Sequence, residues 1–315
     1  MNVQLPIDTA TLRAREKAIA EKYIGGTPWL MVAWGLGNIV LWLALWPLTI
    51  SGVLPLWAGF AIATVCVTAS YLPSHDAQHD IIVPRTSPQH WLNELFGHIV
   101  IFPLGLPFRT ARTTHLQHHR HANDPALDPD YDVHAPSAAA AIWKSLQNRQ
   151  PRGAGSKRYG QILMALETPA AKSALIDAML MNFFNLALLC GLAWSGYAIE
   201  AALLWWLPRQ IAITYINFYL SWAPHHPATE TGRYRETRAF RSLWGNIGSS
   251  GMQYHIIHHL YPNIRLNWTP AAYRELRPIL EARGCELGGL QAREEPPAGR
   301  PAPCARLFSP RPPGA

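Results

Sequence analysis

Eleven of the 14 histidines in the chain gather in four short clusters, and three of these clusters have the spacing of metal ligands. The clusters are His75-x-x-x-His79, His115-x-x-His118-His119-x-His121, His225-His226 and His255-x-x-His258-His259. Residues three and four apart lie on one face of a helix, so each spaced cluster can direct two or three imidazoles toward one point. With one histidine of the 225/226 pair, they provide nine candidate nitrogen ligands. This number is too large for one ion and predicts a site for two metal ions.

The ligand type narrows the chemistry of such a site. Imidazole binds zinc, copper, iron and nickel, so it does not identify the metal by itself. A structural zinc site needs four ligands and would leave more than half of these histidines unused. Soluble di-iron bundles use mainly glutamates with Glu-x-x-His pairs, and the sequence has no such pair. A pair of iron ions bound almost entirely by histidine, and used for oxygen chemistry, is the favoured interpretation.

Acidic residues beside the clusters are candidates for orienting the histidines, because a metal-bound imidazole usually donates its other N–H group to a carboxylate or a carbonyl. The candidates are Asp76, Asp80, Asp124 and Asp128. Asp76 and Asp80 flank the first cluster directly and are favoured. For Asp130 and Asp132, a solvated acidic loop is an equally good interpretation.

The other histidines have less support from spacing. We favour His225 as the ligand from the 225/226 pair and expect His226 to lie beside the site. His121 is either a further ligand or a hydrogen-bonding partner of one. Three histidines without supporting spacing are expected to be ordinary polar residues: His90, His98 and His134.

Long apolar runs must position these clusters. Residues 29–50 and 53–72 contain no charged residue, and residues 174–196 and 198–222 contain very few. Each run has about the 20 residues needed to cross a bilayer, and buried core helices are the less favoured alternative. Pro73 is expected to end or kink the second run just before the first histidine cluster. The sequence therefore predicts an all-α membrane protein with four transmembrane helices in two hairpins and a histidine-rich helical cap.

The distribution of basic residues predicts the orientation. The turns near Ser51 and Tyr197 contain no Lys or Arg, whereas residues 74–173 contain ten and the chain after residue 222 contains twelve. Cytoplasmic segments collect Lys and Arg, so both termini and the cap are expected to be cytoplasmic. The net charge of +7 is attributed to contacts with anionic lipid rather than nucleic acid, because basic and aromatic residues do not alternate along the chain.

Three regions are expected along the chain. Residues 1–27 form a cytoplasmic amphipathic segment, with a helix over residues 10–23 lying at the membrane surface. Residues 28–285 form the membrane domain. Residues 286–315, rich in Pro and Arg, form a disordered tail.

Shorter segments connect the spans to the clusters. Residues 91–107 are apolar but contain Glu94, His98 and Pro103, which indicates a re-entrant or interfacial segment. A helix over residues 109–122 is expected to carry the second cluster. Residues 270–283 are predicted to form a soluble helix that stops at Gly284.

Arg209 is the one basic residue inside an apolar run. Trp222 is at the cytoplasmic end of that run, and a helix rise of 1.5 Å per residue places Arg209 about 20 Å from it. The expected role is therefore to extend its charge to the far interface, without contact with the metal site.

The order HxxxH, HxxHH, a histidine after a span, then HxxHH resembles the membrane fatty acid desaturase superfamily over about residues 50–285. The resemblance implies a non-haem di-iron centre that activates O2 and removes hydrogen from an unactivated C–H bond, giving a double bond or a hydroxyl group. The implied ligands are His75, His79, His115, His118, His119, His225, His255, His258 and His259. Residues 118–130 and 254–262 also resemble carotenoid-ring hydroxylases and ketolases of the same superfamily.

The family resemblance also bears on the source of electrons. The chain has neither the His-Pro-Gly-Gly motif of a fused cytochrome b5 nor a cysteine set for an iron–sulfur cluster. A separate donor such as a ferredoxin or cytochrome b5 is then required, and basic cytoplasmic residues are expected to dock it.

These observations lead to three functional hypotheses. The first is an O2-dependent oxidoreductase acting on a lipid, with a fatty acyl chain as the default substrate. The second is a carotenoid-ring hydroxylase or ketolase that uses the same mechanism. The third, a membrane metal transporter, is disfavoured because its ligands would lie in mid-span, and none of the four apolar runs contains a histidine.

Overall fold

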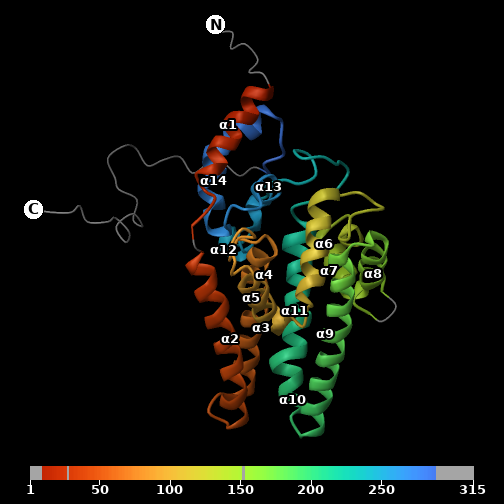
Figure 1. The fold of residues 1–315 in the computed structure, drawn as a ribbon. Helices are drawn as coiled ribbons and strands as arrows, with labels where there is room; N and C mark the ends of the chain where they lie inside the picture. Colours follow the sequence, from red (N-terminus) through yellow and green to blue (C-terminus); the bar gives the residue numbers. More distant parts are fainter. Residues whose placement is uncertain (1–8, 27, 151–152, 289–315) are drawn as a thin grey trace, which may run out of the picture.

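The computed structural model describes residues 9–26, 28–150 and 153–288. Within these residues, all regular secondary structure is helical, apart from an isolated antiparallel bridge between Ile24 and Ile264. Figure 1 shows the long helices α2, α3, α9 and α11 running beside one another, with α1, α13 and α14 gathered at one end of them. The expected tail, residues 286–315, lies almost entirely outside the described residues.

The first helical hairpin carries the first histidine cluster. It consists of α2 (Trp29–Ile50), α3 (Leu56–Ala69) and α4 (Tyr71–Gln78), and α2 has the bounds expected from the sequence. Pro73 has no N–H group to donate to the carbonyl of Ala69, and the helix is interrupted at Ser70. The proline therefore coincides with a one-residue break in the helix, and residues 56–78 still count as one candidate span. The break lies on the N-terminal side of the proline, and the helix then continues far enough to include His75.

The second hairpin consists of α9 (Pro169–Trp194) and a helix over residues 198–222. The latter is divided into α10 (Ala198–Ala201), the π-helical η3 (Ala202–Trp206), α11 (Leu207–Ile216) and the π-helical η4 (Asn217–Trp222). Large apolar side chains of α9 face outward: Met179 is 65% exposed and Phe183 is 73% exposed. Such a surface is stable in lipid and unfavourable in water.

Three described helices are long and apolar enough to cross a membrane: Trp29–Ile50, Leu56–Gln78 and Pro169–Trp194. The fourth expected span, residues 198–222, is helical throughout but is divided by its two π-helical segments. The all-helical membrane architecture is confirmed, with three candidate spans, or four if the bent pair Trp91–Leu104 and Phe108–His121 is counted as one span. Residues 198–222 are not among these candidates.

A sharp bend places the second histidine cluster. α5 (Trp91–Ile101) and η1 (Phe102–Leu104) lead to α6 (Phe108–His121). The axis of the segment Trp91–Leu104 and the axis of α6 differ in direction by 97°. Gly105 adopts a positive φ of 59° at the bend. This geometry, that of a broken span or a re-entrant loop, agrees with the expectation for residues 91–107. The helix expected at 109–122 is α6.

Three side chains of the second hairpin donate hydrogen bonds to backbone carbonyls of the bend. Trp205 Nε1 donates to the carbonyl of Pro103 at 2.9 Å, and Arg209 Nε donates to that of Leu104 at 2.7 Å. Asn185 donates to the carbonyl of Gly105 at 3.1 Å. The expectation that Arg209 extends to the far interface is therefore wrong, because a backbone carbonyl at membrane depth needs a donor from the protein.

Shorter elements complete the cap. They are η2 (Tyr131–Val133), α7 (Ala138–Asn148), α8 (Ala154–Leu166), α12 (Gly245–Gly248), η5 (Met252–Tyr254), α13 (His255–Leu260), η6 (Leu266–Trp268) and α14 (Thr269–Ala282). The expected helix at 270–283 is α14, with Pro270 in its first turn and a positive φ of 65° at Gly284. α7 was not predicted, although Ser137 accepts a hydrogen bond from the backbone N–H of Ala140 at its start.

The N-terminal helix α1 (Thr9–Glu21) packs against α14, and Figure 1 shows both at the end of the molecule away from the α9–α10 turn. Glu16 of α1 is fully buried. Its carboxylate accepts hydrogen bonds from Tyr234 at 2.9 Å, Tyr261 at 2.9 Å and Arg283 at 3.0 Å. These contacts hold the buried face of α1 against the rest of the protein, and the location of this helix at the membrane surface stays a prediction.

Glu16→Gln should destabilise the cap. The substitution removes the charge that three donors share, and a hydrogen bond to a charged group contributes about 1.5–3 kcal/mol. We expect a loss of that order in the free energy of unfolding, measured by thermal denaturation of the detergent-solubilised protein. Glu21→Gln is the matched control, since Glu21 makes an exposed ion pair with Lys17 at 3.7 Å and should contribute little. Equal destabilisation by the two variants would contradict this account of α1.

Candidate metal centre

Nine histidines from four segments meet on the cap side of the long helices. Two come from α4 and its end, three from α6, one from the segment after η4 and three from α13. They are His75, His79, His115, His118, His119, His225, His255, His258 and His259. Seven of them are no more than 8% exposed, and His115 and His119 are partly buried. The structure thus brings together all nine residues predicted from the sequence as ligands.

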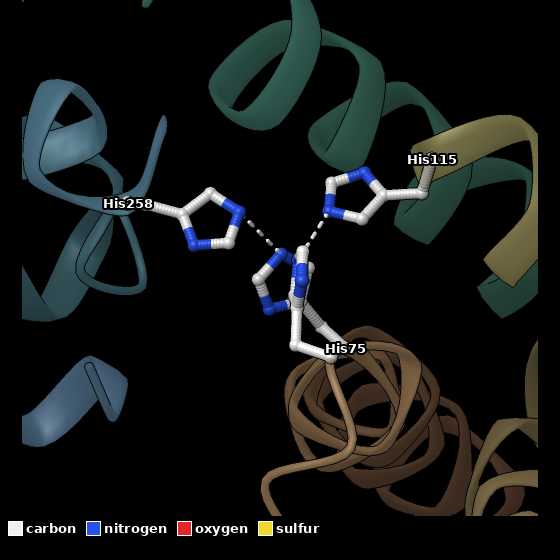
Figure 2. A group of neighbouring side chains, drawn as sticks. His75, His115 and His258 are labelled. Atoms are coloured by element: carbon white, nitrogen blue, oxygen red, sulfur yellow. Dashed lines mark hydrogen bonds between the residues drawn. The ribbon is translucent and has the colours of Figure 1, made fainter. Parts of the chain in front are cut away.

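One group of four consists of His75, His79, His115 and His258, whose ligand nitrogens all lie within 4.8 Å of one another. The Nε2 atoms of His75 and His258 are 3.1 Å apart, and those of His79 and His115 are 2.9 Å apart. Figure 2 shows His75, His115 and His258 directing their rings toward one another from three different elements. This arrangement has the donor number and spacing of a site for one metal ion.

A second group of four consists of His118, His225, His255 and His259, again with ligand nitrogens within 4.8 Å of one another. The Nε2 atoms of His118 and His225 are 3.1 Å apart. All four side chains are buried. The structure therefore supports His225, rather than His226, as the residue that completes the site.

His119 lies between the two groups. Its Nε2 atom is 2.9 Å from that of His258 and 3.1 Å from that of His115, both in the first group. Its ring stacks on His259 of the second group, with 4.2 Å between ring centroids.

The two HxxHH clusters are divided between the groups, which the sequence analysis did not anticipate. α6 gives His115 to the first group and His118 to the second, and α13 gives His258 to the first and His255 and His259 to the second. Positions three apart differ by about 60° around a helix axis, so one helix between two sites can serve both. The expectation that each cluster converges on one point is wrong for these two helices.

Asp128 orients His118. Its Oδ1 atom lies 2.8 Å from Nδ1 of His118, and the carboxylate is fully buried. The carboxylate also accepts backbone N–H groups of Asn123 and Asp130, both at 2.8 Å. Burial alone would raise the pKa of Asp128, but the interaction with His118 and these N–H groups lowers it to about 2. Asp128 is therefore an anion at neutral pH and fixes the opposite nitrogen of His118 toward the group.

Glu236 orients two further histidines. Its backbone carbonyl accepts a hydrogen bond from Nδ1 of His225 at 2.8 Å, and its Oε1 atom lies 3.3 Å from Nδ1 of His259. Burial raises the pKa of Glu236. The sequence analysis missed this residue, because it lies 23 positions before His259 without any periodic relation to a histidine.

The other acidic candidates have different contacts. Asp76 is buried but lies 4.0 Å from Nδ1 of His75, too far for a hydrogen bond. Asp80 does not bond to a clustered histidine: it binds Arg112 at 2.6 Å and His90 at 2.8 Å. Asp124 accepts the backbone N–H groups of Ala126 and Leu127 and so stabilises a turn.

The polar residues around the centre can also be placed. Asp130 accepts hydrogen bonds from Tyr159 and from Ser221, the latter at 2.9 Å. The ring of His226 packs on Trp222, with 4.8 Å between centroids. His121 lines a surface pocket together with His119 and Glu236, and is absent from both groups of four.

The protonation state of seven of the nine histidines fits metal binding. His118 is an exception, because burial lowers its pKa but the charge and hydrogen bond of Asp128 raise it to about 9. Burial lowers the pKa of His255, His258 and His259 well below the usual value, and burial followed by the charge of His118 lowers that of His225 to about 3. Neutral imidazole is the form that binds metal ions. The Nε2 atoms of His255 and His259 are also buried without a hydrogen-bonding partner among the described residues. Orphaned buried nitrogens are costly, and a cation in the second group would satisfy both.

Comparison with known proteins agrees with this geometry. The family model for fatty acid desaturases matches residues 51–289, which include all nine clustered histidines. The chain belongs to the fatty acid desaturase family. Imidazole donors are typical of iron sites as well as zinc and copper sites, so the donor set fits the metal centre that membership implies.

Individual relatives in this desaturase family match shorter stretches. The chain is 30% identical over 115 residues to sn-1 oleoyl-lipid 12-desaturase of Anabaena variabilis, covering 36% of this chain and 31% of the relative. It is 35% identical over 91 residues to the protein of the same name from Synechocystis sp., covering 28% and 23%. Sphingolipid delta(4)-desaturase DES1 of Drosophila melanogaster is 30% identical over 80 residues, 24% of each chain. The alignments thus span less than a third of each relative's length.

Proposed function

We propose that this desaturase-family protein is an O2-dependent oxidoreductase that removes hydrogen from an unactivated C–H bond of a membrane lipid. The observation that carries the proposal is the pair of four-histidine groups, each with its ligand nitrogens within 4.8 Å. His75, His79, His115 and His258 would hold one iron ion, and His118, His225, His255 and His259 the other. His119 is available to the first ion from its position against His115 and His258.

The bound iron pair would supply the activation of O2. The chain's own residues provide the conditions for that chemistry. Asp128 and Glu236 fix the orientation of His118, His225 and His259 through their Nδ1 atoms. Burial of the histidines excludes water, which strengthens electrostatic interactions and protects reactive intermediates.

A fatty acyl chain is the substrate class we favour over a carotenoid ring. The relatives named above are desaturases of oleoyl lipids and sphingolipids. A cavity of about 420 Å³, lined in part by Thr114, His115 and Ile213, gives a lipid access to the first histidine group. Its volume is within the usual range for a small-molecule site.

Electrons would come from a separate acidic donor on the cytoplasmic side, where we also place both termini and the metal centre. A groove of about 540 Å³ runs along the outer face of α6 and contains four arginines, Arg85, Arg109, Arg112 and Arg120. Asp80 pairs with Arg85 and Arg112, and Glu94 pairs with Arg109, so four cations stand against two carboxylates. α6 also carries His115, His118 and His119. A donor in this groove would be one helix away from the metal centre, with complementary charge.

Two measurements on one preparation test the proposal. The purified protein should contain about two irons per chain, since each group of four can hold one ion. Host cells that express the chain should contain new unsaturated or hydroxylated lipids, and a host that also makes a carotene tests the carotenoid alternative by pigment analysis. One zinc ion and no iron would overturn the oxygen chemistry. Iron without any modified lipid or pigment would overturn the substrate assignment.

A further inference from the structure

The cavity beside His115 extends from the metal centre toward the bend between η1 and α6. Its walls come from α6, α9, α11, η4 and the α7–α8 region. His115, Leu106 and Arg209 all line it, and Arg209 contacts the Leu104 carbonyl, which precedes the start of α6. The helix from Phe108 to His115 rises about 10 Å, so the bend and His115 are separated by roughly the length of a medium acyl segment.

Part of the cavity wall is suited to a hydrocarbon chain. Ala111, Val133, Ile213 and Ile216 are among its apolar lining residues. A purely apolar ligand would nevertheless leave the polar part unsatisfied, since Arg209 and Arg149 also line the cavity. Burying charged groups against hydrocarbon without a partner is unfavourable.

Arg209 carries a positive charge that its structural role does not require. Its Nε atom donates to the carbonyl of Leu104 at 2.7 Å. The neighbouring carbonyls of the bend are satisfied in the same way by the neutral donors of Trp205 and Asn185. Among the described residues, no carboxylate forms an ion pair with Arg209, and an unpaired charge within an apolar helix is by default a candidate for function.

Arg149 adds a second cation near Arg209. Its guanidinium donates to Gln210 at 3.1 Å, Ser145 at 2.8 Å and Thr214 at 2.7 Å, all of which are neutral. Burial, followed by the like charge of Arg209, lowers the pKa of Arg149. Two cations near each other, without an acid between them, form a site that an anion would stabilise.

The acidic residues on the cavity wall have partners other than these two arginines. Asp130 is bonded to Ser221, 12 residues along the same helix from Arg209, which is a rise of about 18 Å. Asp132 forms an ion pair with Arg158 at 3.9 Å, and its backbone carbonyl accepts a hydrogen bond from Asn148, next to Arg149. Among the described residues, neither carboxylate forms an ion pair with Arg209 or Arg149, so the part of the cavity beside the bend is cationic.

We propose that Arg209 and Arg149 bind the anionic head group of a single-chain lipid, a carboxylate or a phosphate, whose hydrocarbon chain extends along the cavity to His115. The proposal rests on the lipid-oxidising function proposed above and narrows its substrate class. A lipid held by its head at one end presents a fixed position of its chain to the metal centre. Arg209 is then a residue that determines the position of oxidation as well as affinity.

The test is a competition binding assay with the full-length protein in phosphatidylcholine nanodiscs, at a pH where oleate is ionised. Oleate and lysophosphatidate should each displace a labelled fatty acid at concentrations roughly tenfold to a hundredfold lower than methyl oleate, because a hydrogen bond to a charged group contributes about 1.5–3 kcal/mol. The better competitor of the two anions identifies carboxylate or phosphate as the head group.

Substitutions of Arg209 distinguish the effect of its charge on lipid binding from the effect of its hydrogen bond to Leu104. Arg209→Gln keeps an amide donor for the Leu104 carbonyl but removes the charge, and should reduce the preference for oleate over methyl oleate to what Arg149 alone provides. Arg209→Lys keeps the charge and should keep the preference for the anions. Trp205→Phe is the matched control, since it removes the donor to the neighbouring Pro103 carbonyl and leaves both arginines in place.

Two outcomes would overturn the proposal: equal binding of oleate, lysophosphatidate and methyl oleate by the unaltered protein, or the same loss of preference in Trp205→Phe as in Arg209→Gln. Both are distinct from failure of the proposed function. If cells show oxidised lipid but the protein binds methyl oleate as well as oleate, only the arginine site is wrong. If the anions bind selectively but no lipid is oxidised, only the oxidation is wrong.

Discussion

His258→Ala is expected to abolish lipid oxidation and to remove about one of the two iron ions. His258 is buried, lies 3.1 Å from His75 and 2.9 Å from His119, and belongs to the first group of four. Loss of a residue that merely orients a ligand lowers metal affinity about tenfold to a hundredfold, so loss of a ligand should exceed about a hundredfold. The measurements are iron per folded chain and the yield of modified lipid.

Single substitutions of other histidines test whether each group of four holds its own ion. His255→Ala should remove the ion of the second group and leave that of the first, and His118→Ala should behave like His255→Ala. His90→Ala is the control, because His90 is hydrogen-bonded to Asp80 at 2.8 Å and belongs to neither group. Full loss of both ions in each single variant would show that the groups form one interdependent site. Loss of iron in His90→Ala to the same extent as in His258→Ala would show that the grouping is wrong.

The elements that could be predicted from the sequence are those with a strong local signal. The uncharged run 29–50 is α2, and the segment with Pro270 near its start and Gly284 after its end is α14. Pro73 has no backbone N–H group for the carbonyl of Ala69, and the helix is interrupted at Ser70. By contrast, the docking of α1 depends on Glu16 meeting Tyr234, Tyr261 and Arg283, which are more than 200 residues away. No local pattern contains that information.

The same distinction applies to the metal centre. Imidazole spacing identified eight of the nine clustered histidines, because i, i+3 and i, i+4 relations are local, and His225 was chosen for its position after an apolar run. The division of α6 and α13 between two groups could not be predicted, since it depends on the position of each helix relative to α4 and to His225. The position of Arg209 was predicted wrongly for a related reason. Its partner is the Leu104 carbonyl, 105 residues earlier in the chain, which accepts the Arg209 hydrogen bond at a bend that no pattern near Arg209 indicates.

Asp128→Asn is expected to weaken metal binding in the second group by about tenfold to a hundredfold while leaving the fold intact. The amide has the shape of the carboxylate but lacks the charge that now interacts with His118 at 2.8 Å. The effect should be confined to the group that contains His118, and iron titration of the variant should therefore show one weak and one normal site.

Asp124→Asn is the matched control for this substitution. Both aspartates follow the second histidine cluster within seven residues of His121, and no local pattern distinguishes their roles. Among the described residues, Asp124 accepts hydrogen bonds from two backbone N–H groups, at 2.8 and 2.9 Å, and an asparagine oxygen can accept them as well. Asp124→Asn should keep both ions at normal affinity. If it weakened iron binding as much as Asp128→Asn, the loop's overall negative charge, rather than the hydrogen bond to His118, would be what supports the metal centre.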